Sequence, residues 1–265
     1  MFRKVLSPVD FSEEAVKYIK YADNLAKTLN ASLFLIHSIQ GDYKYYGVDN
    51  KADRNTVLQA VQHKFETWKK TYHFEHVTPI ITFGEITECI AEQVETHSID
   101  LVIMFTRGLD EDEILGTNTT KVAKIAPCPV LSIKTVQETP NFKKILLPID
   151  PKLTVESLST YTVEFIKVMK SEIELIYVGE ETEPARKILE KYTKLYQDAG
   201  IKANYNFVDR EGSIAETIID YSQKNDFSAI IMATHARMGI KALILGSVTE
   251  NCINNATIPI LTLKS

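Results

Sequence analysis

The sequence has 265 residues, of which 45% are hydrophobic and 25% are charged, and its formal net charge is −5 at pH 7. These values are typical of a soluble globular protein with one large or two medium domains, and the acidic balance argues against nucleic acid as a partner. No apolar run is long enough to span a membrane, and we expect no signal peptide because a strand pattern begins within the first residues.

Strand and helix patterns alternate through the first half of the sequence. Ser12 precedes two glutamates and an apolar helical repeat, so it is predicted to cap the first helix, whose positive dipole end the acidic residues favour. Short apolar runs predict strands at 4–9, 33–38, 77–82, 100–105 and 130–134, and helical spacing predicts helices from 13, at 57–72, 86–96 and 118–126.

The second half shows the same alternation. Ser247 and Glu250 have the spacing of a capping box, which predicts Ser247 as the N-cap of a helix that follows a small-residue loop. Free amides and the positive end of that helix would form an anion cradle, unless the segment is an ordinary strand-to-helix connection. We expect strands at 144–149, 172–178, 202–208, 228–233 and 258–263, and helices at 155–169, 184–199, 214–224 and from 248.

The chain contains an internal repeat of domain size. The offset between matching blocks falls from 140 to 128 along the chain, so the first copy has twelve extra residues, which we place within 40–55 as an exposed loop. The tyrosines of this loop, Tyr43, Tyr45 and Tyr46, would either cover a ligand or partner surface or pack locally. We predict domains at 1–137 and 138–265. The matching blocks are 2–10 with 142–150, 31–37 with 171–177, 101–104 with 229–232, and 128–131 with 258–261.

Apolar strands joined by helices predict an α/β fold in which a parallel sheet is covered on both faces. In such sheets ligands bind beyond the carboxyl ends of the strands, where the strand order reverses. Asp10 and Asp150 both follow a predicted first strand and therefore lie at such an end. They are candidates for ligand contact, or for accepting N–H bonds from the segment that follows.

These blocks resemble the universal stress protein family. Its members open with a strand that ends in Pro-Val-Asp, here Pro8-Val9-Asp10 and Pro148-Ile149-Asp150, and their last strand opens with a triplet such as Cys-Pro-Val, here residues 128–130. The resemblance covers both halves nearly end to end. It implies two tandem doubly wound domains, each with a five-stranded parallel sheet of order 3-2-1-4-5, docked through their last strands.

The family's nucleotide-binding members carry a Gly-x2-Gly-x9-Gly-(Ser/Thr) segment that holds phosphates and ribose. The second copy keeps the spacing, but Ala233 and Ala236 replace two of the glycines. A Cβ at a position that needs positive φ or close backbone approach costs roughly 1–2 kcal/mol. By resemblance, the binding residues would be Pro148, Ile149, Asp150, Val178, Met232, Ala233, Thr234, His235, Ala236, Arg237, Gly246, Ser247 and Val248.

The first copy departs further from this pattern. Phe105 stands at the first glycine position, where its ring would take the place of a phosphate, and only seven residues separate Gly108 from Gly116. The acidic run 110–113 would also repel phosphate. We therefore expect this copy to be a degenerate half that packs against its twin.

No P-loop, GxSxG, HExxH or EF-hand motif occurs. We expect His73 and His76 to be polar residues at the surface rather than metal ligands, and His37 to be buried and hydrogen-bonded. Cys89, Cys128 and Cys252 form no CxxC pair and should be small core residues of a reduced, cytoplasmic protein.

The resemblance implies a non-enzymatic stress protein that binds ATP or AMP, with Mg²⁺, in its second half and signals to a protein partner. The alternatives are a scaffold or small-ligand binder that takes no nucleotide and, ranked last, a slow ATPase. We expect a homodimer of tandem chains with no nucleic-acid or membrane partner.

Overall fold

The computed structural model describes residues 2–106, 117–137, 139–150, 160–234 and 245–264. Within these ranges the first half begins with β1, whose C-terminal end leads through a capped turn into the first helix. Its elements are β1 (Lys4–Pro8), α1 (Glu13–Leu29), β2 (Ser32–Ile39), the 3-10 helix η1 (Tyr43–Tyr46), α2 (Arg54–Tyr72), β3 (Thr78–Phe83), α3 (Ile86–His97), β4 (Leu101–Phe105), α4 (Thr117–Ile125) and β5 (Val130–Ile133).

The second half repeats this order without the 3-10 helix among its described residues. Its elements are β6 (Lys144–Pro148), α5 (Thr160–Met169), β7 (Glu172–Val178), α6 (Glu183–Asp198), β8 (Ala203–Val208), α7 (Ile214–Lys224), β9 (Ala229–Thr234), α8 (Ser247–Asn255) and β10 (Ile260–Lys264). The predicted elements agree with these to within a few residues. The start of the helix predicted at 155–169 lies outside the described residues.

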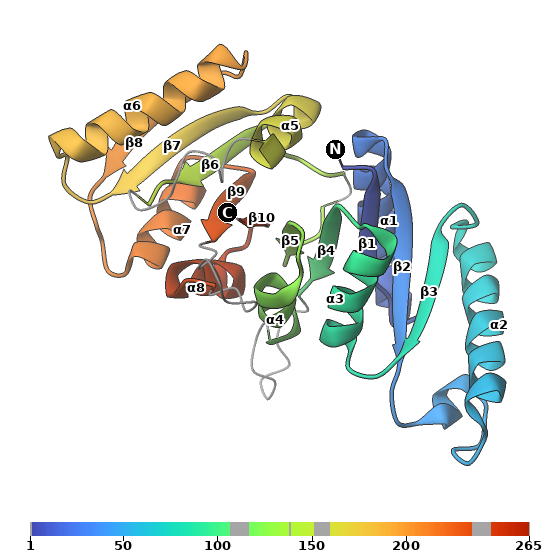
Figure 1. Ribbon diagram of the computed structural model, residues 1–265. Coiled ribbons are helices and arrows are strands. Elements are labelled where there is room, and N and C mark those ends of the chain that lie inside the picture. The colour runs from blue at the N-terminus through green and yellow to red at the C-terminus, as the bar shows by residue number, and fades with distance from the viewer. Residues whose placement is uncertain (1, 107–116, 138, 151–159, 235–244, 265) are drawn as a thin grey trace.

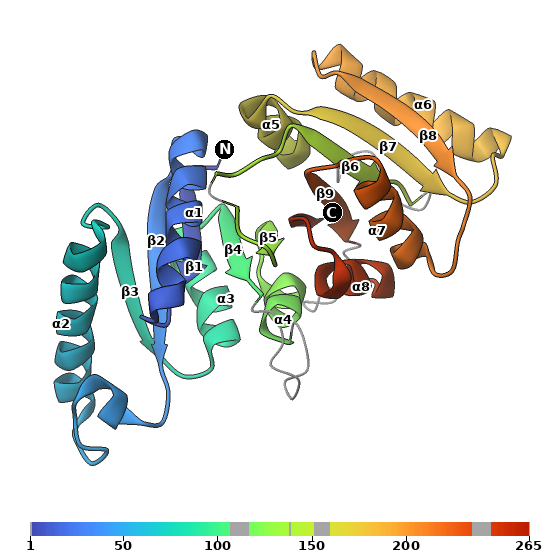
Figure 2. The same cartoon turned by 180° about the vertical axis from the view of Figure 1, so that it is seen from behind.

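The strands form one continuous sheet in the order β3-β2-β1-β4-β5-β10-β9-β6-β7-β8. Each half therefore has the predicted order 3-2-1-4-5, with parallel pairing inside each half. The halves join through their last strands, as predicted, because β5 pairs antiparallel with β10 and sets Leu131 opposite Leu261. The two expected five-stranded sheets are thus one ten-stranded sheet (Figures 1 and 2).

Successive strand residues point to opposite faces of this sheet, and each face has its own core. Val5 of β1 packs on the side of α1, α2, α5 and α6, whereas Leu6 packs on the side of α3, α4, α7 and α8. Both cores run through both halves. Phe2 contacts Phe165 of α5 with 5.8 Å between ring centroids, which ties the start of the chain to the second half.

Helix α4 lies beside α8 at the junction of the halves in both views (Figures 1 and 2). Lys124 Nζ donates to Glu250 Oε1 at 3.0 Å, and Thr120 Oγ1 donates to Asn254 Oδ1 at 3.2 Å. The polar bonds between these helices and the β5–β10 pairing join the halves into one body. The domain limits at 137 and 138 remain a prediction.

The first helix begins as predicted. Ser12 Oγ accepts a hydrogen bond from the Ala15 amide at 3.1 Å, and Asn30 ends α1 in the left-handed conformation at φ 54°. None of the described helices combines the length and the hydropathy that crossing a bilayer requires. The three cysteines are buried and free, as the sequence predicted for core residues.

Candidate functional site

The carboxyl ends of β6, β7 and β9 lie at one edge of the sheet in the second half, because these neighbouring strands are parallel. Pro148 ends β6, and the Ile149 amide then donates to the Ile176 carbonyl at 2.8 Å, which carries Asp150 out to the surface. The first half makes the same bond from Val9 to Ile36 at 2.9 Å. The Pro-Val/Ile-Asp blocks therefore adopt the same backbone arrangement in both copies.

The second strand of this half ends at Val178, which is half-buried. Gly179 follows with φ 142°, and its amide donates to the Val208 carbonyl at 2.9 Å. A left-handed φ of this kind strongly favours glycine. The turn places Val178 at the same edge as Asp150, as the sequence predicted for the end of the second strand.

Met232 and Ala233 lie in β9 next to each other and point to opposite faces. Met232 packs in the core beside α7 and α8, and Ala233 packs against the core of the other face. Ala233 pairs with Leu263 in a regular parallel ladder. The glycine-to-alanine change therefore brings no left-handed strain at this position, contrary to the cost that we considered from the sequence.

Helix α8 starts at the same edge, but its cap differs from the prediction. Gly246 is the N-cap, with φ −63° and ψ 148° and no side-chain cap bond, whereas Ser247 is the first helical residue. The capping box with Glu250 is absent because the N-cap lies one residue earlier than predicted, and the Glu250 carboxylate accepts from Lys124 on α4. Gly246 and Ser247 are exposed, and Val248 is half-buried.

The amides of the first turn of α8 have no acceptor within the helix, because the first helical bond runs from Glu250 to the Gly246 carbonyl at 3.0 Å. A Cβ built on Gly246 meets no described atom within 4 Å. The described residues thus leave the start of α8 exposed as a helix N-terminus, which favours anions. Of the other predicted site residues, Thr234 ends β9, while His235, Ala236 and Arg237 lie outside the described residues.

The corresponding edge of the first half is covered by the extra residues of that copy. The expected irregular loop contains η1, which is capped by Asp42. Tyr45 Oη donates to the Asp10 carbonyl at 2.8 Å, and Tyr46 Oη lies 2.7 Å from His37 Nε2. The tyrosines therefore pack locally, onto the ends of β1 and β2.

His37 is buried and hydrogen-bonded, as predicted. Its Nδ1 lies 2.7 Å from the Val9 carbonyl, which can only accept, so Nδ1 carries the proton and Nε2 accepts from Tyr46. Phe11 lies over the imidazole with 4.4 Å between ring centroids, and it is held at φ 61°. Burial lowers the pKa of His37, and the nearby charge of Lys64 lowers it further.

This lowered pKa makes the stability of the chain depend on pH. Below the ordinary value of 6.5 the unfolded chain binds a proton that folded His37 resists, so the free energy of unfolding should fall as pH drops below 6.5. Replacing His37 by glutamine should remove that contribution. Urea unfolding of both proteins at neutral and mildly acidic pH measures it, and equal losses of stability on acidification would contradict the assignment.

The structure describes some of the other features that the sequence predicted for the first copy. Phe105 does not stand free, because its ring stacks on Tyr18 of α1 with 4.9 Å between centroids and meets the edge of Tyr21 at 6.2 Å. The ring belongs to the packing of α1 on the sheet. Gly108, the acidic run 110–113 and Gly116 lie outside the described residues. The Asp10 carboxylate accepts from the Ser12 amide at 3.0 Å and the Ser12 hydroxyl at 2.7 Å, which is the turn-forming role.

The description of the family model that matches this chain is the universal stress protein family, and it matches twice, over residues 1–134 and 141–264. The chain belongs to the universal stress protein family. It is a tandem member, with one family unit in each half.

Other universal stress proteins resemble this chain at the level of sequence and fold. A relative from Methanocaldococcus jannaschii is 25% identical over 142 residues, which are 46% of this chain and 82% of that protein. One from Synechocystis is 22% identical over 216 residues, 80% of this chain and 69% of its own length. The crystal structure of a universal stress protein from Archaeoglobus fulgidus superposes with a TM-score of 0.70 at 18% identity, covering 100% of this chain and 99% of that one.

The described residues of this universal stress protein contain no group of three or more His, Cys, Asp or Glu side chains placed to hold a metal ion. His76 Nε2 instead lies 2.7 Å from Asp23 Oδ1, and His73 ends α2 in the left-handed conformation. Burial raises the pKa of the Cys252 thiol to about 12, so it is not a nucleophile at neutral pH.

Two residues near the first-copy edge were missed by sequence reasoning. Phe11 follows Asp10 directly, and nothing in its sequence context indicates a left-handed backbone. Lys64 lies four residues before Trp68 on α2, and that spacing was a usable signal because it puts both side chains on one helix face.

Proposed function

We propose that this universal stress protein binds an adenine nucleotide, ATP or AMP, in its second half and signals the occupied state to a protein partner without catalysing a reaction. The site is the edge formed by the ends of β6, β7 and β9 and the start of α8. The cytoplasm is the proposed compartment, since all three thiols are free.

The observation that carries this proposal is the contrast between the two copies. In the first copy Tyr45 and Tyr46 occupy the edge and bond to Asp10 and His37. In the second copy Asp150, Gly246 and Ser247 are exposed at the same edge. The copy that keeps the family spacing of small residues is therefore also the copy whose described residues leave this edge exposed.

The chemistry of the exposed edge suits a phosphorylated ligand. The first-turn amides of α8 and the Ser247 hydroxyl would donate to phosphate oxygens. The Asp150 carboxylate would accept from ribose hydroxyls, and Val178 would offer an apolar contact to the base. Mg²⁺ would accompany the triphosphate of ATP and offset its charge. The carboxylate of Glu250, which would repel phosphate, is drawn toward Lys124 at 3.0 Å.

A thermal-shift titration with ATP and Mg²⁺ tests the proposal. Binding to the folded state alone should raise the melting temperature in a concentration-dependent way. Asp150→Ala should weaken the shift, and Asp10→Ala should leave it unchanged, because Asp10 lies at the covered edge. Absence of any shift in the unmodified protein at millimolar ATP would remove the proposal.

A second candidate is a scaffold or small-ligand binder that takes no nucleotide. The covered edge of the first copy favours it, because that half keeps the family fold with its own side chains in the place of a ligand. Capture of the same partner with and without ATP would distinguish this role. We further propose that tandem chains pair as homodimers, which light scattering in solution would measure.

A further inference from the structure

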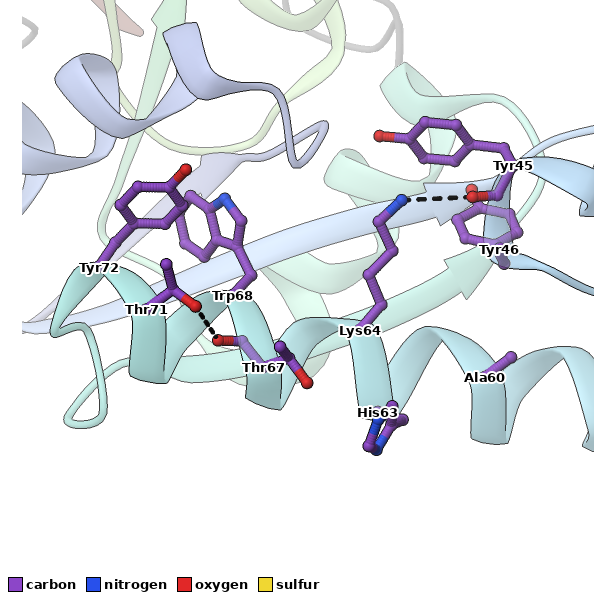
Figure 3. Close-up of a pocket in the computed structure, with 9 residues that line it drawn as sticks. All are labelled: Tyr45, Tyr46, Ala60, His63, Lys64, Thr67, Trp68, Thr71 and Tyr72. Carbon is purple, nitrogen blue, oxygen red and sulfur yellow. Dashed lines mark hydrogen bonds between the residues drawn. The ribbon is translucent and has the colours of Figure 1, made fainter.

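A pocket that is separate from the proposed nucleotide site opens between η1 and the outer face of α2. Its cavity volume is about 600 Å³, within the range of small-molecule sites. Figure 3 shows Trp68 and Tyr72 on one side and Tyr45 and Tyr46 on the other, with Lys64 rising from α2 between them. Four of the nine lining residues are thus tyrosine or tryptophan and one is lysine, and the others are Ala60, His63, Thr67 and Thr71.

Lys64 is unusual among the described lysines because aromatic rings surround its ammonium group. Its Nζ lies 3.6 Å from the Tyr45 ring centroid and 5.8 Å from those of Phe11 and Tyr46. Its hydrogen-bond acceptor is the Tyr45 carbonyl at 3.3 Å. In the described part of the chain no carboxylate lies within ion-pair distance of it, and burial lowers its pKa. A positive charge so placed is stabilised by an incoming anion.

Trp68 supplies a second donor. The residue is 7% exposed, and its Nε1 is buried with no hydrogen-bond partner in the part of the chain that the structure describes. An unsatisfied buried N–H of this kind destabilises the folded chain until an acceptor reaches it. The Lys64 ammonium has a carbonyl acceptor but no carboxylate partner among the described residues, and the Trp68 N–H has no acceptor there. Both groups are donors, so the ligand group that suits them is an acceptor with negative charge.

We propose that the pocket between η1 and α2 binds a small aromatic carboxylate. The carboxylate pairs with Lys64 and accepts from Trp68 Nε1 after a small opening of the rings, and the aromatic part stacks among Tyr45, Tyr46 and Tyr72. A single cation matches a monocarboxylate better than a nucleotide polyphosphate. Tyr45 and Tyr46 belong to the extra residues of the first copy, so the site is specific to that half and stands whether or not the second half binds nucleotide.

The test uses 2-naphthoate and its uncharged amide as probes on the full chain. Trp68 is the single tryptophan of the sequence, so the indole N–H gives one NMR signal that reports on this pocket alone. We expect 2-naphthoate to shift that signal saturably, and calorimetry to give at least about tenfold weaker binding for 2-naphthamide, because the charge-assisted bond is lost.

Two lysine variants of α2 complete the design. Lys64→Met keeps the length of the side chain and should weaken the binding of 2-naphthoate by at least about tenfold. Lys70 is an exposed lysine outside the pocket, so Lys70→Met should leave the affinity for 2-naphthoate unchanged. Equal binding of naphthoate and naphthamide, full affinity in Lys64→Met, or an indole signal that stays still at millimolar naphthoate would each overturn the proposal.

Discussion

Replacing Gly246 by phenylalanine should abolish the thermal stabilisation by ATP while the protein itself stays folded. Gly246 has φ −63° and ψ 148°, which any residue adopts, and a Cβ there meets no described atom within 4 Å. The phenyl ring would therefore enter the space above the α8 amides, where the phosphate is proposed to lie. At an ATP concentration of a hundred times Kd, the stabilisation lost would be about 2.7 kcal/mol.

Gly246→Ala is the matched control. Its methyl group occupies the same open space but leaves the amides accessible, so most of the ATP shift should remain. Melting of both variants without ligand shows whether the fold is intact. An unchanged ATP shift in Gly246→Phe would mean that nucleotide binds elsewhere on the chain, which separates an error in the site from an absence of binding in the unmodified protein.

Two Ser-x-x-Glu sequences that stand at the start of a helix show how far local sequence determines where a helix begins. Ser213 and Glu216 form the full capping box on α7, with the Glu216 amide 3.2 Å from Ser213 Oγ and the Ser213 amide 2.8 Å from Glu216 Oε2. Ser247 and Glu250 have the same spacing and form none. On α8 the N-cap is Gly246 rather than Ser247, and the Glu250 carboxylate pairs with Lys124 of the other half. No local pattern contains that information.

The fold itself was predictable to a large extent. The repeat follows from matching blocks such as 2–10 and 142–150, and the alternation of strands and helices follows from apolar periodicity. The strand order and the joining through the last strands were implied by the resemblance to the family. The continuity of the sheet did not follow, because it depends on the β5–β10 register that sets Leu131 against Leu261.

The candidate site was predictable only in its location. Asp150, Val178 and Gly246 come to one edge because parallel strands end together, and that rule needs no side-chain detail. The corresponding edge of the first half is covered because Tyr45 and Tyr46 form hydrogen bonds with Asp10 and His37. Those contacts are tertiary, so the sequence left two roles open for the tyrosines, and the structure selects local packing.

The junction of the halves should dominate the stability of the whole chain. Leu131 and Leu261 face each other across β5 and β10, and both are fully buried. Truncating either to alanine should lower the free energy of unfolding by about 2–5 kcal/mol, from lost burial and the cavity that remains. The loss of unfolding free energy in the double variant should differ from the sum of the two single losses by about 0.5–3 kcal/mol, because residues in contact couple energetically.

Urea unfolding followed by circular dichroism and by Trp68 fluorescence measures these changes. Since the sheet and both cores are continuous across the halves, each variant should shift the signals of both probes together, although Trp68 belongs to the first half alone. Val168→Ala, at a side chain that is 43% exposed on α5, is the control and should change the free energy by no more than about 0.5 kcal/mol. If Leu261→Ala moved the circular dichroism transition but left that of Trp68 in place, the halves would unfold independently and the junction would be a contact between separate units.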